Sequence, residues 1–482
     1  MSGGGKRVTG ADVRAKLGHP VVDGDSHILE HGPALNDFLR EVGGAKMVEQ
    51  LAAYRLQTPR GYRDIWWSRP SGEHTIDLAS SMLPKLYKKR FDELGIDFSI
   101  LYSSVGLGAM HVRDDDLRQA LHRAINTMYA AIFAEVGDRM TPSAVIPTHT
   151  PEEAIAELDY AVGTLGLKAI TVNSEVRKPI PEVLRDAPHL AHLTERTYSI
   201  AHDALYDYDP FWKRCVELKV APACHTKTAG IGSTRNSPSS FVFNHLGGFA
   251  SGSEFLCRSV FLGGVPHRFP GLNFQFLEGN STWALGLYND ICEHWEKRNV
   301  IALKRNLNPH NMQVDVLIDA FENYGDAHLR ADRIRANPHF MPTDLEIPED
   351  HLDEFKACGI RRMDDIRAVF ENNFFFGCEA DDRLASCAFN RKLHHAGARL
   401  NTTFSSDLGH WDVVDMTQVL PESYEGVELG LFTPEDFRDF TFANTVRCVG
   451  GMNPDFFKGT IVEAEAAKVL AEAKRPRRSA AE

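Results

Sequence analysis

The feature that most constrains the fold is the alternation of eight short apolar runs with stretches of helical spacing. The runs are rich in β-branched and aromatic residues and span residues 20–27, 97–104, 142–149, 167–174, 220–226, 272–279, 373–379 and 398–407. Helical patterns such as PEEAIAELDYAVGTLG and DPFWKRCVELK directly precede two of them. This alternation favours parallel strands joined by right-handed crossovers, and eight units close a (β/α)8 barrel. We therefore predict an α/β TIM barrel, with a doubly wound open sheet as the alternative.

The spacing of the runs predicts two large insertions. The stretches 28–96 and 280–372 are far longer than a βα loop needs. We expect helical insertions after strands 1 and 6, the second at about residues 281–371, which form a cap over the barrel mouth or an oligomer interface. The barrel itself is expected over 20–460, after a disordered segment 1–19 and before a C-terminal helix and basic tail at 461–482.

Composition narrows the class of partner. A 43% hydrophobic content over 482 residues supports a large core. A net charge of -13 opposes binding to nucleic acid or an anionic membrane, because both are polyanions. The N-terminus lacks the apolar segment of a secretory signal, and eight cysteines without a CxxC pair fit neither a zinc ribbon nor a disulfide framework. We expect a cytoplasmic protein with a small-molecule substrate, as a homo-oligomer or as a hetero-oligomer with a related subunit.

Polar side chains gather where the predicted strands end. These residues are Asp25 and His27 after strand one, His149 after strand three, His225 after strand five, Glu278 after strand six and Asp407 after strand eight. Side chains alternate along a strand, so Asp23, Asp25 and His27 share one face. The carboxyl ends of the strands carry the chemistry of a (β/α)8 barrel. The strand-end residues are therefore candidates for one common site.

Carboxylates and imidazoles that converge at one barrel mouth need a cation to offset their repulsion and desolvation. Mixed histidine and carboxylate ligands suit zinc, iron or manganese. Two of these residues also have a purely structural interpretation. Asp25 could cap the turn after its strand, and Asp407 could be the N-cap of a helix. Their joint placement favours one or two divalent ions held by Asp25, His27, His225 and Asp407, with Glu278 as a further ligand or a general acid/base.

Four neighbouring residues are candidates for supporting roles. His410 is expected to act in catalysis together with Asp407 and Glu278. His245 and Glu30 would orient the site from just outside it. Arg235 lies in the glycine-rich stretch TAGIGSTRN after strand five and could receive a substrate carboxylate.

Several of these segments resemble the amidohydrolase-related family of the metal-dependent amidohydrolase superfamily. The resemblance rests on VVDGDSHILE, RFDELGIDFSILY, FPGLNFQFLEGNSTW and FSSDLGHWD and covers about residues 20–460. It is to the branch that contains aminocarboxymuconate semialdehyde decarboxylase and the hydroxybenzoate decarboxylases. The resemblance implies a metal pair at the end of strand one, a histidine after strand five and an aspartate after strand eight, which here are Asp25, His27, His225 and Asp407.

Two departures from the family pattern leave the reaction open. Asp25 replaces a histidine or glutamate, and Glu278 stands where the decarboxylases carry a catalytic histidine. We expect metal-assisted hydrolysis or non-oxidative decarboxylation of a small carboxylate-bearing substrate. One alternative is an O2-dependent dimetal monooxygenase, because relatives of that kind share this barrel. The other alternative is a non-catalytic partner subunit of such an enzyme.

Overall fold

The computed structural model describes residues 7–57, 69–225, 237, 239–337 and 348–473. Its centre is a sheet of eight parallel strands in the order β1-β2-β3-β4-β7-β8-β9-β10. The strands are β1 (Val22–Ile28), β2 (Phe98–Ser103), β3 (Met140–Val145), β4 (Ala169–Val172), β7 (Pro222–Cys224), β8 (Phe274–Phe276), β9 (Phe374–Cys378) and β10 (Asn401–Phe404). Each lies within or overlaps one of the eight predicted runs, so the predicted (β/α)8 fold is confirmed.

The barrel closes where the chain leaves β10 and meets β1. The amide of Asp407 donates to the carbonyl oxygen of Asp25 at 3.0 Å, and the amide of His27 donates to that of Leu408 at 2.7 Å. The register between β1 and β2 shifts between Asp23 and Ser26. The closing seam therefore runs through the segment that holds several of the candidate ligands.

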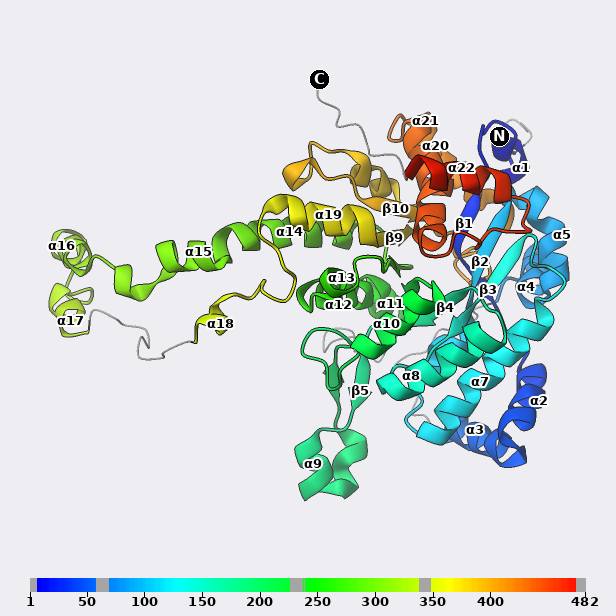
Figure 1. Cartoon of the computed structure of the whole chain (residues 1–482), viewed down its shortest axis with the longest axis horizontal. Coiled ribbons are helices and arrows are strands. Elements are labelled where there is room, and N and C mark those ends of the chain that lie inside the picture. Colours follow the sequence, from blue (N-terminus) through cyan, green and yellow to red (C-terminus); the bar gives the residue numbers. More distant parts are fainter. Residues whose placement is uncertain (1–6, 58–68, 226–236, 238, 338–347, 474–482) are drawn as a thin grey trace.

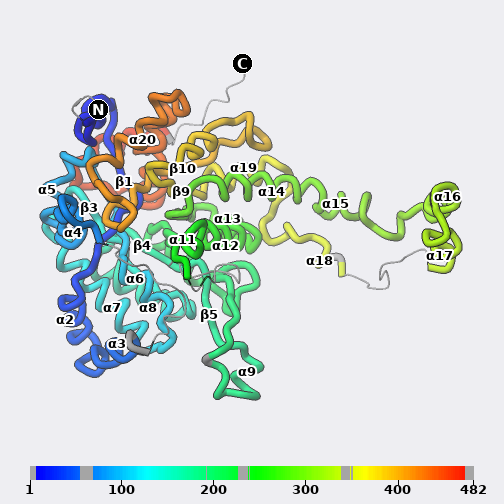
Figure 2. The backbone as a smooth tube through the Cα atoms, turned by 180° about the vertical axis from the view of Figure 1, so that it is seen from behind, coloured from blue at the N-terminus to red at the C-terminus, as the bar shows by residue number. Residues whose placement is uncertain are grey.

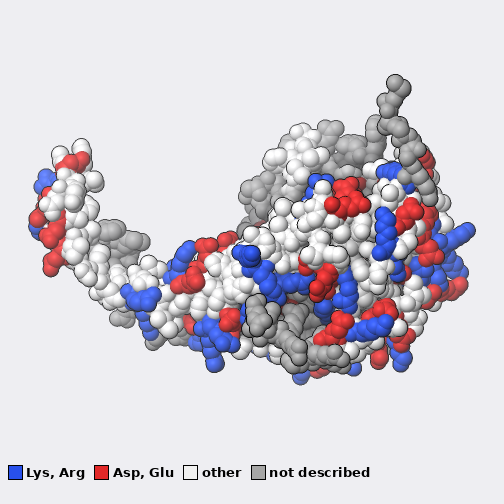
Figure 3. All heavy atoms as spheres, turned by 90° about the horizontal axis from the view of Figure 1, so that it is seen from above, with Lys and Arg blue, Asp and Glu red and all other residues white. Residues whose placement is uncertain are grey.

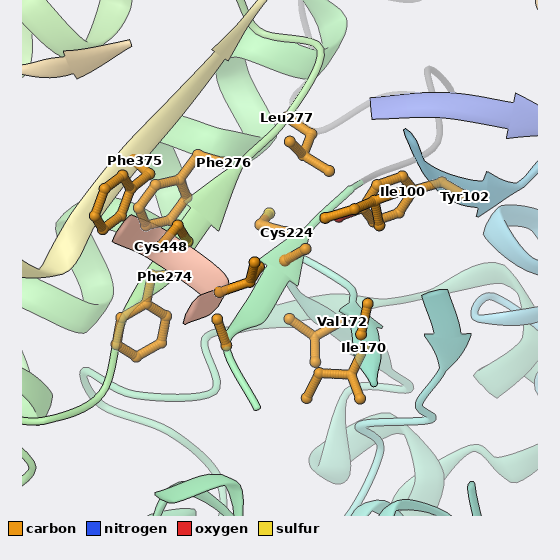
Figure 4. Close-up of a cluster of buried hydrophobic side chains, with 14 of the residues drawn as sticks. Ile100, Tyr102, Ile170, Val172, Cys224, Phe274, Phe276, Leu277, Phe375 and Cys448 are labelled. Carbon is orange, nitrogen blue, oxygen red and sulfur yellow. The ribbon is translucent and has the colours of Figure 1, made fainter. Parts of the chain in front are cut away.

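Helices surround the barrel (Figure 1). Those that follow or precede its strands are α5 (Pro84–Leu94), α7 (Asp115–Ile132), α8 (Pro151–Leu158), α10 (Asp209–Leu218), α12 (Gly248–Leu262), α14 (Thr282–Arg298), α19 (Met363–Asn373), α20 (Val419–Glu428) and α22 (Glu463–Ala473). Their amphipathic spacing buries one face against the sheet. Figure 4 shows part of the resulting core, in which side chains of β2, β4, β7, β8 and β9 lie together.

The insertion after β1 lies beside the barrel. It contains α2 (Gly32–Gly43), α3 (Ala45–Gln57) and α4 (Thr75–Met82), and α2 packs against α7. A second, short projection is the antiparallel pair β5 (Val176–Lys178) and β6 (Arg196–Tyr198), with α9 (Pro181–Asp186) at its tip. The sequence does not predict this hairpin, because its strands are only three residues long and lack an apolar pattern.

The insertion after β8 forms a long arm. It continues from α14 through α15 (Val300–Ala302), η4 (Leu303–Leu307), α16 (Val314–Tyr324), α17 (Ala331–Ala336) and α18 (Glu349–Leu352) before α19 returns to the barrel. Figures 1 and 2 show the arm reaching away from the barrel, with α16 and α17 at its outer end. Both roles expected for this insertion, a cap over the barrel mouth and an oligomer interface, stay predictions.

The expectation of disorder over residues 1–19 is wrong for residues 7–19. Helix α1 (Gly10–Arg14) begins with a capping box in which Thr9 and Asp12 exchange hydrogen bonds, and Val13 is buried in the core. The local TGAD pattern and one apolar anchor are enough to order this segment. Among the helices described, none has the length and apolar content that crossing a membrane requires.

Candidate metal centre

The candidate ligands meet at the carboxyl ends of the strands. Asp25 and His27 lie within β1, His225 follows β7 directly, Glu278 lies two residues beyond β8, and Asp407 lies three residues beyond β10. All five are at most 5% exposed. The structure therefore brings together every residue that the sequence predicts as a ligand.

Histidine nitrogens and carboxylate oxygens face one another across this cluster. His27 Nε2 lies 3.1 Å from His225 Nε2, 3.6 Å from Asp25 Oδ1 and 3.1 Å from Asp407 Oδ1. His225 Nε2 lies 2.9 Å from Glu278 Oε2 and 3.9 Å from Asp25 Oδ1. Two overlapping sets of potential ligand atoms result, one of Asp25, His27 and His225 and one of His27, Glu278, Asp407 and His410. Because both sets use His27, they describe one compact centre.

Asp25 carries the clearest sign that a cation belongs here. Both of its carboxylate oxygens are buried and have no hydrogen-bond partner among the described residues. Burial, followed by the charges of Glu278 and Asp407, raises the pKa of Asp25 well above its usual value. Two imidazole nitrogens about 2.1 Å from one ion would be roughly 3.0–3.4 Å apart, and the observed 3.1 Å fits that spacing. The donor set therefore fits a divalent metal.

The loop after β10 places His410 over the cluster. Its ring stacks on that of His27, with centroids 3.5 Å apart, and its Nδ1 lies 2.7 Å from Asp407 Oδ1. Gly409 makes this possible, since its φ is +104° and a Cβ there would lie 2.6 Å from the carbonyl oxygen of His27. Burial opposes a charged His410, but Asp407 and Glu278 outweigh it and raise the pKa of His410.

Glu278 and Asp407 both adopt a left-handed backbone conformation, and the side chain of each lies in the cluster. Their φ angles are +54° each, a region that few residues other than glycine adopt. This conformation breaks the alternation of side chains after β8. Phe276 therefore packs against Trp283 and Phe374 while Glu278 faces the histidines, although strand parity would put both on one face.

Asp23 does not join the cluster, although β1 alternation puts it on the face of Asp25 and His27. Its carboxylate accepts hydrogen bonds from the Ser406 amide at 3.0 Å, the Ser406 hydroxyl at 2.5 Å and the Ser99 hydroxyl at 3.4 Å. Asp23 thus ties β1 to β2 and to the segment after β10. The register shift after Asp23 separates its surroundings from those of Asp25.

The residues predicted to support the site lie at different places. Glu30 accepts hydrogen bonds from the Ser103 hydroxyl, the Tyr129 hydroxyl and the Val105 amide, so its partners come from the β2 and α7 side. The His149 imidazole lies 3.7 Å from Glu153, outside both ligand sets.

His245 ends α11 (Phe241–His245) and lies outside both sets of potential ligand atoms. It contacts Phe249, whose own ring lies 5.8 Å from that of His225. Arg235 falls outside the described residues.

Two further acidic residues border the cluster and were not predicted. Glu379 directly follows β9, and burial together with Asp407 and Glu278 raises its pKa to about 10. Burial and Asp407 raise the pKa of Asp412 to about 7. The strand-end rule that identified Glu278 would also have identified Glu379, since the predicted seventh strand ends on it.

A parallel eight-stranded barrel with a buried histidine–carboxylate centre at its strand ends defines a metal-dependent enzyme of the TIM-barrel class. The family model described as amidohydrolase matches residues 49–307, more than half of the chain. The chain therefore belongs to the amidohydrolase family, which confirms the resemblance seen in the sequence. No curated protein sequence matches it significantly.

Solved structures agree with the fold. An amidohydrolase from Mycobacterium avium subsp. paratuberculosis is 15% identical, with 90% of this chain and 100% of that chain covered and a TM-score of 0.50. A 2,6-dihydroxybenzoate decarboxylase from Rhizobium is 15% identical, with coverage of 89% and 98% and a TM-score of 0.49. A 5-carboxyvanillate decarboxylase from Novosphingobium aromaticivorans, solved with manganese, is 15% identical, with coverage of 90% and 96% and a TM-score of 0.45.

Proposed function

We propose that the protein uses one divalent metal to catalyse hydrolysis or non-oxidative decarboxylation of a small carboxylate-bearing substrate. The observation that carries this proposal is the buried carboxylate of Asp25, which has no hydrogen-bond partner among the described residues and lies beside the paired imidazoles of His27 and His225. Asp25, His27, His225 and Asp407 would hold the ion. A metal bound there lowers the pKa of a coordinated water and polarises a substrate oxygen.

The remaining groups can handle protons. Asp407 Oδ1 lies 2.7 Å from His410 Nδ1, a distance short enough for proton transfer between the two side chains. His410 is the most exposed member of the cluster, which supports a role in contact with substrate. Burial raises the pKa of Glu278, but the neighbouring His225 and His410 outweigh it and lower the pKa, which keeps the carboxylate ionised. We assign the proton transfers to Glu278 and to the Asp407–His410 pair.

The first test is metal content and turnover of the purified protein. We expect about one ion per chain by mass spectrometry, as for a single closed set of ligands. A panel of small aromatic and aliphatic carboxylates, followed by release of CO2 or of hydrolysis product, should identify turnover that stops after chelation and returns with manganese or zinc. Activity that survives complete removal of metal would contradict the proposal.

The same assay separates this proposal from a dimetal oxygenase. Hydrolysis and non-oxidative decarboxylation consume no O2, so turnover under argon should equal turnover in air. Two ions per chain together with an absolute requirement for O2 would overturn the assignment.

The matched control for substitutions of the candidate metal ligands is Asp37→Asn, because Asp37 is an exposed aspartate on α2.

A further inference from the structure

The candidate metal centre is covered. Its five candidate ligands are at most 5% exposed, and the side chain of His410 is 18% exposed. An ion has to come within bonding distance of these ligands, and a substrate oxygen within bonding distance of the ion. Part of the cover must therefore move aside whenever a metal or a substrate enters.

One side of the cover comes from the segment after β7. Phe249, in the first turn of α12, forms a T-shaped pair with the candidate ligand His225, with ring centroids 5.8 Å apart. His245, the last residue of α11, forms a second T-shaped pair with Phe249 at 5.6 Å. The ring of Phe249 therefore connects α11 to the metal centre.

The other side of the cover comes from the loop after β10. Trp411 directly follows His410, and its ring contacts those of Phe241 and His245 at centroid distances of 5.5 and 5.6 Å. Phe241 and His245 also contact each other, at 4.9 Å. β7 and β10 are not neighbours in the sheet, because β8 and β9 lie between them. The rings of Phe241, His245 and Trp411, which we call the aromatic clasp, therefore join two separate parts of the barrel rim.

Helix α11 is loosely held. It has five residues, none of which is buried, and Val242 and Phe243 are exposed. Segments with so little buried surface open most easily. Asn244 exchanges two hydrogen bonds with the backbone of Ser237, which keeps this segment together. Gly247, between α11 and α12, has a φ of +66°, and the conformational freedom of glycine lets the chain bend there. Helix α11 can therefore move as one unit about Gly247.

Apolar contact holds the clasp. Figure 3 shows Lys, Arg, Asp and Glu interspersed over the face that it presents, on the barrel and on the arm alike. Phe241 and Trp411 carry no charge, and ring pairs of this geometry are individually weak. The clasp can therefore open and close without breaking an ion pair between these two rings.

The clasp also restrains His410. On one side of His410, the backbone of Gly409 lies tight against the His27 carbonyl oxygen and Ser81 of α4. On the other side, Trp411 is held in the clasp. His410 stacks on His27 between these two restraints. Release of Trp411 would therefore loosen the position of His410 over the candidate ligands.

We propose that α11 is a lid over the metal centre, which closes when Phe241 and His245 pack on Trp411 and then holds His410 in its stacked position. This inference rests on the proposed function, because the lid serves a reaction at that centre. The closed lid shields the centre from water and aligns His410. The open lid admits the metal and the substrate.

The test is the kinetics of manganese binding to the full chain, measured by stopped flow with EDTA as the competing chelator. Phe241→Ala removes one ring of the clasp. Association and dissociation should both become at least about tenfold faster while Kd stays within about twofold, because the lid gates passage of the ion but supplies no ligand. The matched control is Phe243→Ala, which removes an exposed ring from the same helix and should leave both rates unchanged.

Unchanged rates in Phe241→Ala would overturn the lid. Faster dissociation alone, with weaker binding, would overturn it as well, because that result indicates a damaged metal centre. Phe241→Leu keeps most of the side-chain volume and replaces the alanine variant if that variant does not fold.

A second measurement needs neither metal nor turnover. Acrylamide quenching of Trp411 is obtained as the difference between each protein and its Trp411→Phe counterpart. The quenching constant should rise at least about twofold in Phe241→Ala, since the indole loses a covering ring, and should stay at the wild-type value in Phe243→Ala. An unchanged constant in folded Phe241→Ala would overturn the lid. A protein that binds no manganese contradicts the proposed function instead, so the two failures are distinguishable.

Discussion

His27 and His225 point their Nε2 atoms at each other across 3.1 Å, although β1 and the end of β7 are separated by almost 200 residues of chain. Neutral imidazoles can share at most one hydrogen bond in this arrangement, and burial together with His410 and His225 lowers the pKa of His27. A cation between them uses both nitrogen lone pairs. The geometry of this histidine pair therefore supports metal binding between the two rings.

His225→Ala should reduce metal affinity at least about 100-fold, because loss of one ligand leaves an incomplete coordination shell. Isothermal titration with manganese checks this. Asp25→Asn should weaken binding in the same experiment but should raise the melting temperature of the metal-free protein, since it removes a buried carboxylate that no described residue hydrogen-bonds. Unchanged manganese affinity in both variants would exclude these residues as ligands.

Asp407→Asn should abolish turnover and leave the fold intact. Asparagine tolerates the left-handed backbone at this position, whereas alanine would add roughly 1 kcal/mol of strain. Comparison of circular dichroism, melting temperature and turnover for the two variants separates chemistry from folding. Full activity in Asp407→Asn would remove this side chain from the mechanism.

Glu278→Gln should lower kcat by roughly 100-fold or more while manganese binds within about tenfold of wild type, as expected for a general base. The amide keeps the shape of the side chain but cannot accept a proton. Turnover and metal titration on the same preparation provide the test. A loss of metal in parallel with the loss of kcat would make Glu278 a ligand instead.

Metal-free protein should lose stability as pH rises, in part through Glu379. The pKa of this carboxyl is about 10 in the folded protein against 4.5 ordinarily. Between those values the folded state holds a proton that the unfolded chain releases, so the free energy of unfolding falls from about pH 4.5 toward pH 10. Melting temperatures between pH 5 and 9 should fall less steeply for Glu379→Gln, while the exposed Glu428→Gln should follow wild type.

Gly409→Ala should impair catalysis through geometry alone. Its added Cβ would meet the His27 carbonyl oxygen, and its φ of +104° is strained for alanine. His410 would leave its stack on His27, so kcat should fall while the charged ligands stay in place. The expected cost in the free energy of unfolding is about 1–3 kcal/mol, measurable by urea titration. An unchanged kcat would show that the position of His410 is not critical.

The barrel could be predicted because its signals are local. Each of the eight strands carries an apolar run with a polar end, and periodicity alone locates it along the chain. The candidate ligands followed from the same pattern, since parallel strands end at one rim and His225, Glu278 and Asp407 each follow a strand. Glu379 follows the same rule and could have been included. The amidohydrolase likeness rested on short local motifs of the same kind.

Other features depend on contacts that no local pattern contains. Asp23 and Asp25 look equivalent in the sequence, yet across the register shift Asp23 accepts hydrogen bonds from Ser406 while Asp25 has no hydrogen-bond partner among the described residues. Left-handed backbone at Glu278 reverses the face that strand parity assigns to it. Helical periodicity could predict an insertion after the sixth strand but not its direction, because direction is set by packing between distant segments. The sequence thus determined which elements form and which groups end them, while the closure of the barrel decided which of those groups face one another.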